Sequence, residues 1–180
     1  GMMDYFLDEL NIGEKNLLSL LDDDGQPGDL IKKIKSFFGR GQEDIDHLFF
    51  YFVGHGDTDR EGKYSLCTAC AERGNPASLF RIEDLVNTLN NQFASRVKHC
   101  YFILDACYAG QALPYFEKIN KISTMLFSSC HRDKRTEIKG NMPMFTQALL
   151  EVLDERKSPT FSGICESVVE LLKKQYGEKA

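Results

Sequence analysis

The sequence predicts an α/β protein built around a mostly parallel sheet, and three observations support this. Short apolar runs of strand length alternate along the chain with longer segments whose apolar residues recur at helical spacing. The two strongest runs, residues 48–53 and 100–104, are rich in the aromatic and β-branched residues that strands prefer. The 180 residues contain no repeat or low-complexity tract, so we expect one domain over residues 2–180 with a sizeable core.

In the first half of the chain, strands and helices are expected in alternation. Residues 16–21 are a candidate strand, and Asp29 can cap a following helix with the apolar residues Leu30, Ile34, Phe37 and Phe38 on one side. Residues 48–53 form the next strand, and residues 64–66 can add a short one after a polar stretch. Residues 81–93 predict a helix, because one face carries Ile82, Leu85, Val86, Leu89 and Phe93.

The second half repeats this alternation. Residues 100–104 form a strand, and residues 113–119 follow as an amphipathic stretch with Leu113, Phe116 and Ile119 on one side. Residues 124–129 predict another strand. Residues 144–153 and 164–176 predict helices, the second with Val168, Leu171 and Leu172 facing inward.

Chemically informative strings follow the two strongest strands. Gly54-His55-Gly56 comes after the first, and Asp105-Ala106-Cys107-Tyr108-Ala109-Gly110 comes after the second, 52 residues later. Functional groups of open parallel sheets gather at the carboxyl ends of the strands. If the two strands are neighbours, the His55 imidazole and the Cys107 thiol emerge at one edge, as a thiol nucleophile and its base require.

These residues resemble the caspase-like cysteine peptidases, in which His-Gly ends one strand and Ala-Cys ends the next. The string around Cys107 is similar to that of metacaspases and bacterial caspase homologues, because Asp105 stands where true caspases carry Gln. Residues 17–23 resemble the second family strand and its acidic end. Residues 127–137 and 145–150 are similar to the strand and the helix that follow the cysteine in the family.

The resemblance implies a caspase-like three-layer sandwich, with helices flanking a mostly parallel central sheet. It also implies a gap in that sheet. The family opens with an apolar strand inside the sheet, whereas residues 2–10 resemble the end of the helix that comes after it. We therefore expect the first strand to be missing from residues 2–180, and an upstream segment, a partner chain or another segment of the chain to take its place in the sheet. Gly1 is interpreted as a tag remnant.

The resemblance also implies roles for the residues of the two strings. Cys107 would be the nucleophile and His55 its catalytic partner. The backbone N–H groups of Gly56 and Cys107 would form the oxyanion hole, and such donors are worth roughly 3 kcal/mol each. Asp105 would line the primary pocket and pair with an Arg or Lys side chain of a protein or peptide substrate.

Each of these residues also has a purely structural interpretation. Cys107 alone would be a buried core cysteine, and His55 alone a structural hydrogen-bonding residue. Gly56 could be a turn glycine, and Asp105 could cap the following helix. The corresponding alternative for the whole chain is a catalytically silent caspase-fold module for protein–protein interaction.

No cofactor is expected, and two patterns bear on metals. Cys67-x-x-Cys70 is half of a zinc site, which needs four ligands, and Cys130-His131 could supply the other pair only if the fold brought them together. Two loop thiols are the favoured interpretation. The run Asp22-Asp23-Asp24 could bind Ca2+ but lacks the ligand spacing of an EF-hand, and a solvated turn before Gly25 is the commoner explanation.

Composition excludes several classes of function. The net charge is −5 and the pI about 5.4, so there is no basic footprint for nucleic acid. No apolar run approaches the ~20 residues that cross a bilayer, and we expect no membrane association. The chain shows no secretory signal, so its six cysteines are expected as reduced thiols in the cytoplasm.

Overall fold

The computed structural model describes residues 2–10, 12–41, 43–59, 61–136, 138–139, 142–155 and 160–177. It divides into two compact units, one of residues 19–135 and one of residues 1–18 with 136–180. Gly1 and the last three residues lie outside the described residues, and the single domain over residues 2–180 stays a prediction. Within the described part, no helix has the length and hydropathy needed to cross a membrane.

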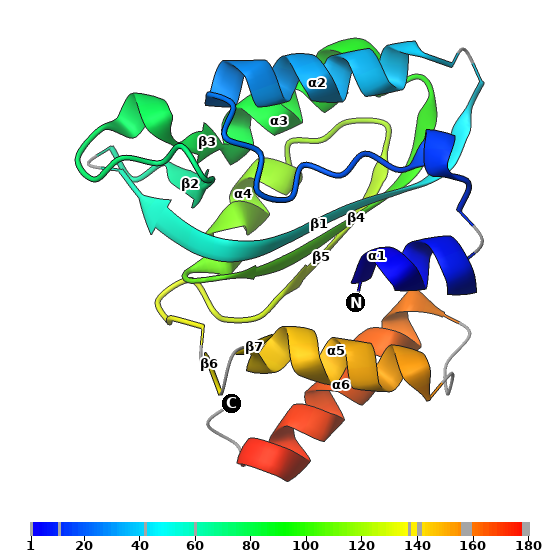
Figure 1. Ribbon diagram of the computed structural model, residues 1–180, viewed down its shortest axis with the longest axis vertical. Coiled ribbons are helices and arrows are strands. Elements are labelled where there is room, and N and C mark those ends of the chain that lie inside the picture. Colours follow the sequence, from blue (N-terminus) through cyan, green and yellow to red (C-terminus); the bar gives the residue numbers. More distant parts are fainter. Residues whose placement is uncertain are drawn as a thin grey trace. The chain divides into compact units, whose positions relative to one another are not determined.

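The unit of residues 19–135 contains a five-stranded sheet in the order β3-β2-β1-β4-β5 (Figure 1). The strands are β1 (Ile45–Thr58), β2 (Tyr64–Cys67), β3 (Phe80–Arg81), β4 (Val97–Ala106) and β5 (Ser123–Ser128). β1, β4 and β5 are parallel, whereas β2 and β3 add antiparallel pairings. The α/β class is confirmed, with a mixed sheet whose centre is parallel.

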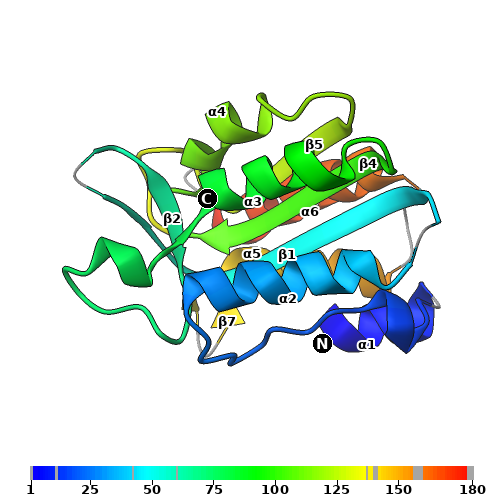
Figure 2. The ribbon, with the colours of Figure 1, turned by 90° about the horizontal axis from the view of Figure 1, so that it is seen from above.

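Three helices of this unit lie over one face of the sheet (Figure 2). They are α2 (Pro27–Gly39), α3 (Ile82–Thr88), which continues as a π-helical turn over Leu89–Phe93, and α4 (Leu113–Phe116). α2 begins one turn earlier than the sequence predicted, because Pro27, with its fixed φ, starts the helix instead of Asp29 capping it. The amphipathic stretch at 113–119 forms only one helical turn.

Aromatic contacts hold these helices to the sheet and to each other. The Phe102 ring of β4 stacks on Phe116 of α4 with 3.8 Å between centroids. The rings of Phe38 and Phe93 lie 4.6 Å apart and join α2 to the end of α3. Since all four side chains are nearly inaccessible to solvent, they form the centre of the core on this face.

β1 extends past the predicted strand and changes partner along its length. Up to Gly54 it pairs with β4, where Gly54 lies opposite Ala106. From His55 to Thr58 it pairs with β2 instead, with His55 opposite Cys67. The sequence predicted a strand end at Val53, whereas the hairpin with β2 keeps the backbone of Gly54-His55-Gly56 extended.

The strand predicted over residues 16–21 is wrong. Glu14–Asn16 form a 3-10 turn, and residues 17–20 have no regular secondary structure. An apolar run becomes a strand only beside another strand that accepts its hydrogen bonds. In the described part of the chain, no strand pairs with β1 along residues 45–54 on the edge away from β4. The resemblance predicted such a gap.

The second unit contains two predicted helices, α5 (Met144–Asp154) and α6 (Phe161–Tyr176), which pack on each other. Thr160 caps α6, because its hydroxyl accepts the Gly163 N–H at 3.1 Å. The short helix α1 (Met2–Asp4) continues into a π-helical turn. The pair of short strands β6 (Ile138–Lys139) and β7 (Met142–Pro143) precedes α5.

Candidate functional site

The parallel pairing of β1 and β4 places His55 and Cys107 at one edge of the sheet. Gly54 and Ala106 are register partners, His55 is the next residue of β1, and Cys107 is the first residue after β4. The His55 side chain is exposed and Cys107 is half-buried, so solvent or a substrate can reach this edge. The segments that carry the two predicted residues are thus neighbours in the sheet, although β1 does not end there and continues to Thr58.

Gly56 lies where the backbone of Cys107 crosses closest to β1. A Cβ atom at this position would overlap the Cys107 carbonyl oxygen and the Tyr64 hydroxyl. The absence of a side chain therefore has a steric cause, and Gly56 is not a turn glycine with positive φ. The approach brings together the two residues from which oxyanion donors were predicted.

The peptide group after Cys107 is fixed at both of its ends. Its carbonyl oxygen accepts a hydrogen bond from the Tyr64 hydroxyl at 3.0 Å. Its N–H, which belongs to Tyr108, donates to the Lys134 carbonyl at 2.8 Å. Tyr108 has a φ of 59°, a left-handed conformation that is costly for an aromatic residue. Such a turn persists only where its surroundings enforce it, as these two hydrogen bonds do.

The segment after β5, residues 129–135, closes around the turn at Cys107. The Gly110 N–H donates to the Cys130 carbonyl at 3.1 Å, and the Cys130 thiol donates to the Ala106 carbonyl at 3.1 Å. A Cβ atom on Gly110 would come within 2.8 Å of the Arg132 backbone nitrogen. The glycine that ends the sequence string is therefore needed for the close passage of this segment.

Arg135, from the same segment, brings a positive charge to the site. Its Nε donates to the Tyr108 hydroxyl at 3.0 Å. The pKa of the exposed Arg135 guanidinium is raised by this hydrogen bond first, then by the charges of Tyr108 and Cys107. The Arg135 side chain is thus held against Tyr108, the residue that follows Cys107.

Cys67 is the cross-strand neighbour of His55. Directly opposed residues of an antiparallel pair project to the same face, so the thiol and the imidazole share one side of the sheet. Burial raises the pKa of Cys67, with smaller contributions from the charges of Asp57 and Cys107. A second thiol therefore stands beside the predicted dyad.

Asp105 occupies the strand end but is fully buried. Its register partner is Val53, two residues before His55, so the carboxyl and the imidazole lie on the same face. The proposed role of Asp105 in substrate binding stays a prediction. A substrate side chain could reach the carboxyl only after the atoms that cover it move.

One residue of the acidic run at 22–24, Asp23, stabilises the turn that contains it. The Asp23 carboxylate accepts hydrogen bonds from the Gly25 N–H at 2.9 Å and from the Lys33 ammonium. The Lys33 hydrogen bond, followed by the one from Gly25, lowers the pKa of Asp23. These contacts fit the turn interpretation of the run.

The Cys67-x-x-Cys70 pair does not converge with other metal ligands in the part of the chain that the structure describes. Cys70 instead lies 3.3 Å from the Thr68 hydroxyl oxygen and 3.7 Å from the Ser78 carbonyl oxygen. Among the described residues, no group of three or more His, Cys, Asp or Glu side chains is arranged to hold a metal ion. All six cysteines are free thiols.

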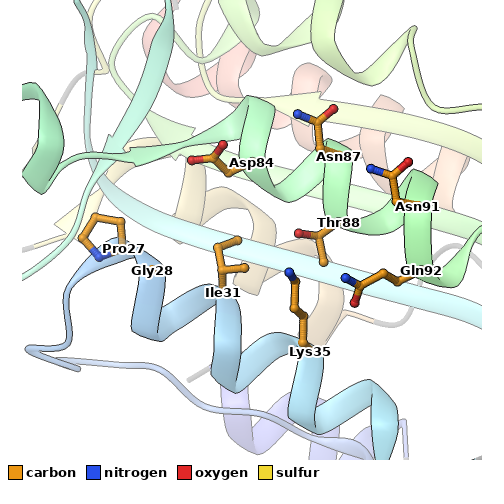
Figure 3. Close-up of a pocket in the computed structure, with 9 residues that line it drawn as sticks. All are labelled: Pro27, Gly28, Ile31, Lys35, Asp84, Asn87, Thr88, Asn91 and Gln92. Atoms are coloured by element: carbon orange, nitrogen blue, oxygen red, sulfur yellow. The ribbon is translucent and has the colours of Figure 1, made fainter.

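A pocket of about 340 Å3 lies elsewhere, between α2 and α3 (Figure 3). Ile31 and Lys35 of α2 point toward α3, where Thr88 and Gln92 line the other side. None of the predicted site residues borders it. The pocket is open and lined mainly by polar residues, and it is therefore not assigned to the chemistry of Cys107.

The sequence interpretation missed the residues that hold the Cys107 turn. Tyr64 was assigned only to a short strand, and Lys134 and Arg135 were given no role. They contact the turn from 43, 26 and 27 residues away in sequence, respectively, so no local pattern marks them. The sequence held one signal for Tyr64. A tyrosine in a buried strand usually has a hydrogen-bond partner for its hydroxyl, so Tyr64 could have been expected to bond a distant group.

Comparison with known families places this arrangement in a defined class. A peptidase family described as "Caspase domain" matches residues 21–180, which is most of the chain. The protein therefore belongs to the caspase domain family, and its function is of the cysteine peptidase type. No curated protein matches the sequence.

Proposed function

We propose that this protein is a cysteine endopeptidase that uses Cys107 and His55 and cleaves after Arg or Lys, as metacaspases do. One observation supports the dyad above all others. The register of β1 and β4 pairs Gly54 with Ala106, and His55 and Cys107 come directly after these two residues. The half-buried thiol and the exposed imidazole leave room for a peptide.

The proposed reaction uses only groups of the chain itself. His55 accepts the thiol proton, and the Cys107 sulfur bonds to the substrate carbonyl carbon. The N–H groups of Gly56 and Cys107 hold the resulting oxyanion. The C–N bond then breaks as the imidazolium protonates the leaving amine. Water, deprotonated by His55, hydrolyses the thioester and releases the carboxylate product and the thiol.

Asp105 is the proposed determinant of basic specificity. Its carboxyl lies two residues before the nucleophile and on the His55 face of the sheet. A carboxylate matches a guanidinium through two parallel hydrogen bonds. Since the carboxyl is fully buried, substrate binding must open the space above it. Arg135 is the competing candidate, because its exposed guanidinium is bonded to Tyr108, the residue after Cys107, and would favour an acidic substrate side chain.

The proposal needs no cofactor, and Ca2+ enters it only as a regulator acting through the run at residues 22–24. Protein or peptide substrates are the proposed partners, together with a chain or an upstream segment that pairs with the open edge of β1. The cytoplasm is the proposed compartment. A silent interaction module remains the alternative, and it differs from a peptidase in the reactivity of Cys107.

Selective modification of Cys107 tests the proposed function. Iodoacetamide at about pH 6, followed by peptide mapping, should label Cys107 first, because an imidazolium partner maintains the reactive thiolate. Cys100 and Cys165 are internal controls, since burial raises the pKa of Cys100 to about 12 and that of Cys165 to about 11. A peptide ketone ending in Arg should modify the same thiol. Equal labelling of all accessible cysteines, unchanged in His55→Ala, would favour the silent module.

Replacing Asp105 tests the proposed specificity. Asp105→Asn keeps the size of the side chain and removes its charge, so a substrate guanidinium would lose its partner. We expect kcat/KM for a peptide ending in Arg or Lys to fall by ~10²-fold, with a much smaller change for one ending in Leu. Thermal unfolding should be measured in parallel, because the side chain is buried. Wild-type cleavage after Asp in preference to Arg would reject basic specificity and implicate Arg135.

A further inference from the structure

Tyr64 is a buried residue that contacts the proposed catalytic centre from outside the strings that define it. It begins β2, and its side chain is 0 % exposed. Its hydroxyl donates to the Cys107 carbonyl oxygen at 3.0 Å and lies at the point where Gly56 has no side chain. One phenol therefore touches both residues that supply the proposed oxyanion donors.

The hydrogen bond from Tyr64 fixes the orientation of the peptide group between Cys107 and Tyr108. The Cys107 carbonyl and the Tyr108 N–H belong to one planar peptide group. Tyr64 holds the oxygen, and the Lys134 carbonyl holds the N–H at 2.8 Å. With both ends held, the plane cannot rotate, and the left-handed turn at Tyr108 is maintained. The backbone of Cys107 then keeps its distance from Gly56.

We infer that Tyr64 is a positioning residue for the peptidase reaction, whose hydroxyl locks the peptide after Cys107 against Gly56 and so sets the geometry of the oxyanion hole. This inference rests on the proposed function of Cys107 and Gly56. Tyr64 itself does not touch the substrate in this role. It acts through the Cys107 carbonyl, and its contribution is the fixed placement of two N–H donors before the reaction begins.

The surroundings of Tyr64 keep its hydroxyl in the donating form. Burial raises the pKa of Tyr64 well above that of a free phenol, and the charges of Cys130, Cys107 and Cys67 add to the effect. The hydroxyl therefore stays protonated over the range in which a Cys–His dyad operates. The strand is anchored as well, because the Tyr64 N–H donates to the Tyr115 hydroxyl oxygen at 3.2 Å.

Tyr64→Phe is the direct test, because it keeps the ring and removes only the donor. We expect kcat to fall by roughly 10- to 100-fold while KM changes less than about twofold, since loss of precise placement acts on the transition state rather than on substrate binding. Inhibition by a peptide aldehyde, which forms a tetrahedral adduct with the thiol, should weaken in proportion to kcat/KM. Binding of the same peptide ending in an unreactive amide should not change.

The matched control is Tyr101→Phe, which removes a phenol hydroxyl that bonds the exposed His47 ring at 3.3 Å. It should leave kcat and KM at wild-type values. If Tyr64→Phe fails to fold, Tyr115→Phe loosens the same strand from outside the core and should lower kcat to a smaller extent. The ratio of wild-type to Tyr64→Phe activity should be constant between about pH 6 and 9, because the hydroxyl does not titrate there.

The outcomes separate this inference from the proposed function. Unchanged kcat in Tyr64→Phe, or a rise in KM that accounts for the whole loss, would overturn the positioning role while Cys107→Ala still abolished activity. Full activity in Cys107→Ala would instead reject the proposed function, and the positioning role with it. A loss of kcat in Tyr64→Phe, with unchanged KM and weakened aldehyde inhibition, supports both the positioning role of Tyr64 and the proposed function.

Discussion

Replacing Cys107 by Ala should reduce peptide hydrolysis to background, a loss of roughly 10³-fold or more in kcat/KM. The variant keeps the backbone that contacts Gly56 and removes the only atom proposed to attack the substrate. His55→Ala should cause a loss of similar size, because the two side chains act as one unit and a thiol without its base is a poor nucleophile. The double variant should be no worse than either single one.

The control for this experiment is Cys70→Ala. Cys70 lies in the loop after β2, where its sulfur contacts Thr68 and Ser78 instead of the dyad. Cys70→Ala and Cys107→Ala should both unfold at nearly the wild-type temperature. If Cys107→Ala hydrolyses the same peptides at a normal rate, the activity arises elsewhere and the proposed nucleophile is wrong.

Replacing Gly56 by Ala should cause the second large loss, about 10²-fold or more in kcat/KM. The added Cβ would overlap the Cys107 carbonyl oxygen, which is backbone and cannot swing aside, as well as the Tyr64 hydroxyl. The turn that carries the nucleophile must then move away from β1, and a displacement of about 1 Å is enough for a loss of this size. We also expect a destabilisation of about 1–3 kcal/mol from overpacking.

Gly28→Ala is the matched control, because it makes the same chemical change in open space. A Cβ atom on Gly28, in the first turn of α2, would meet no atom within 4 Å. It should leave activity unchanged and stabilise the helix slightly, because Ala loses less backbone entropy than Gly on folding. Normal turnover by Gly56→Ala would show that the contact with Cys107 tolerates a methyl group, and the steric role of Gly56 would be rejected.

The spacing of apolar residues was enough to find most elements of the chain. The helix over residues 81–93 was predicted from five apolar residues on one face, and all five are buried. The predicted strand at residues 100–104 lies within β4. These predictions depend only on period and residue type, which a folded structure uses directly. The run at residues 16–21 had the same local appearance and failed, because none of the strands in the described part of the chain pairs with it.

By itself, the sequence determined that an apolar strand segment runs up to His55 and another up to Cys107, since the apolar runs and the glycines beside them are local features. It also determined the family, which the match over residues 21–180 established. Only the tertiary structure decided that β1 continues past His55 to pair with β2, and that Asp105 is buried.

Only the tertiary structure, too, decided what surrounds the Cys107 turn. Tyr64 bonds Cys107 from 43 residues earlier in the chain, and Lys134 bonds Tyr108 from 26 residues later. Such contacts depend on the path of the whole chain rather than on any local period. The physical reason is that a pattern of apolar residues reports which face of an element is buried, whereas a hydrogen bond between distant residues exists only once the elements have packed.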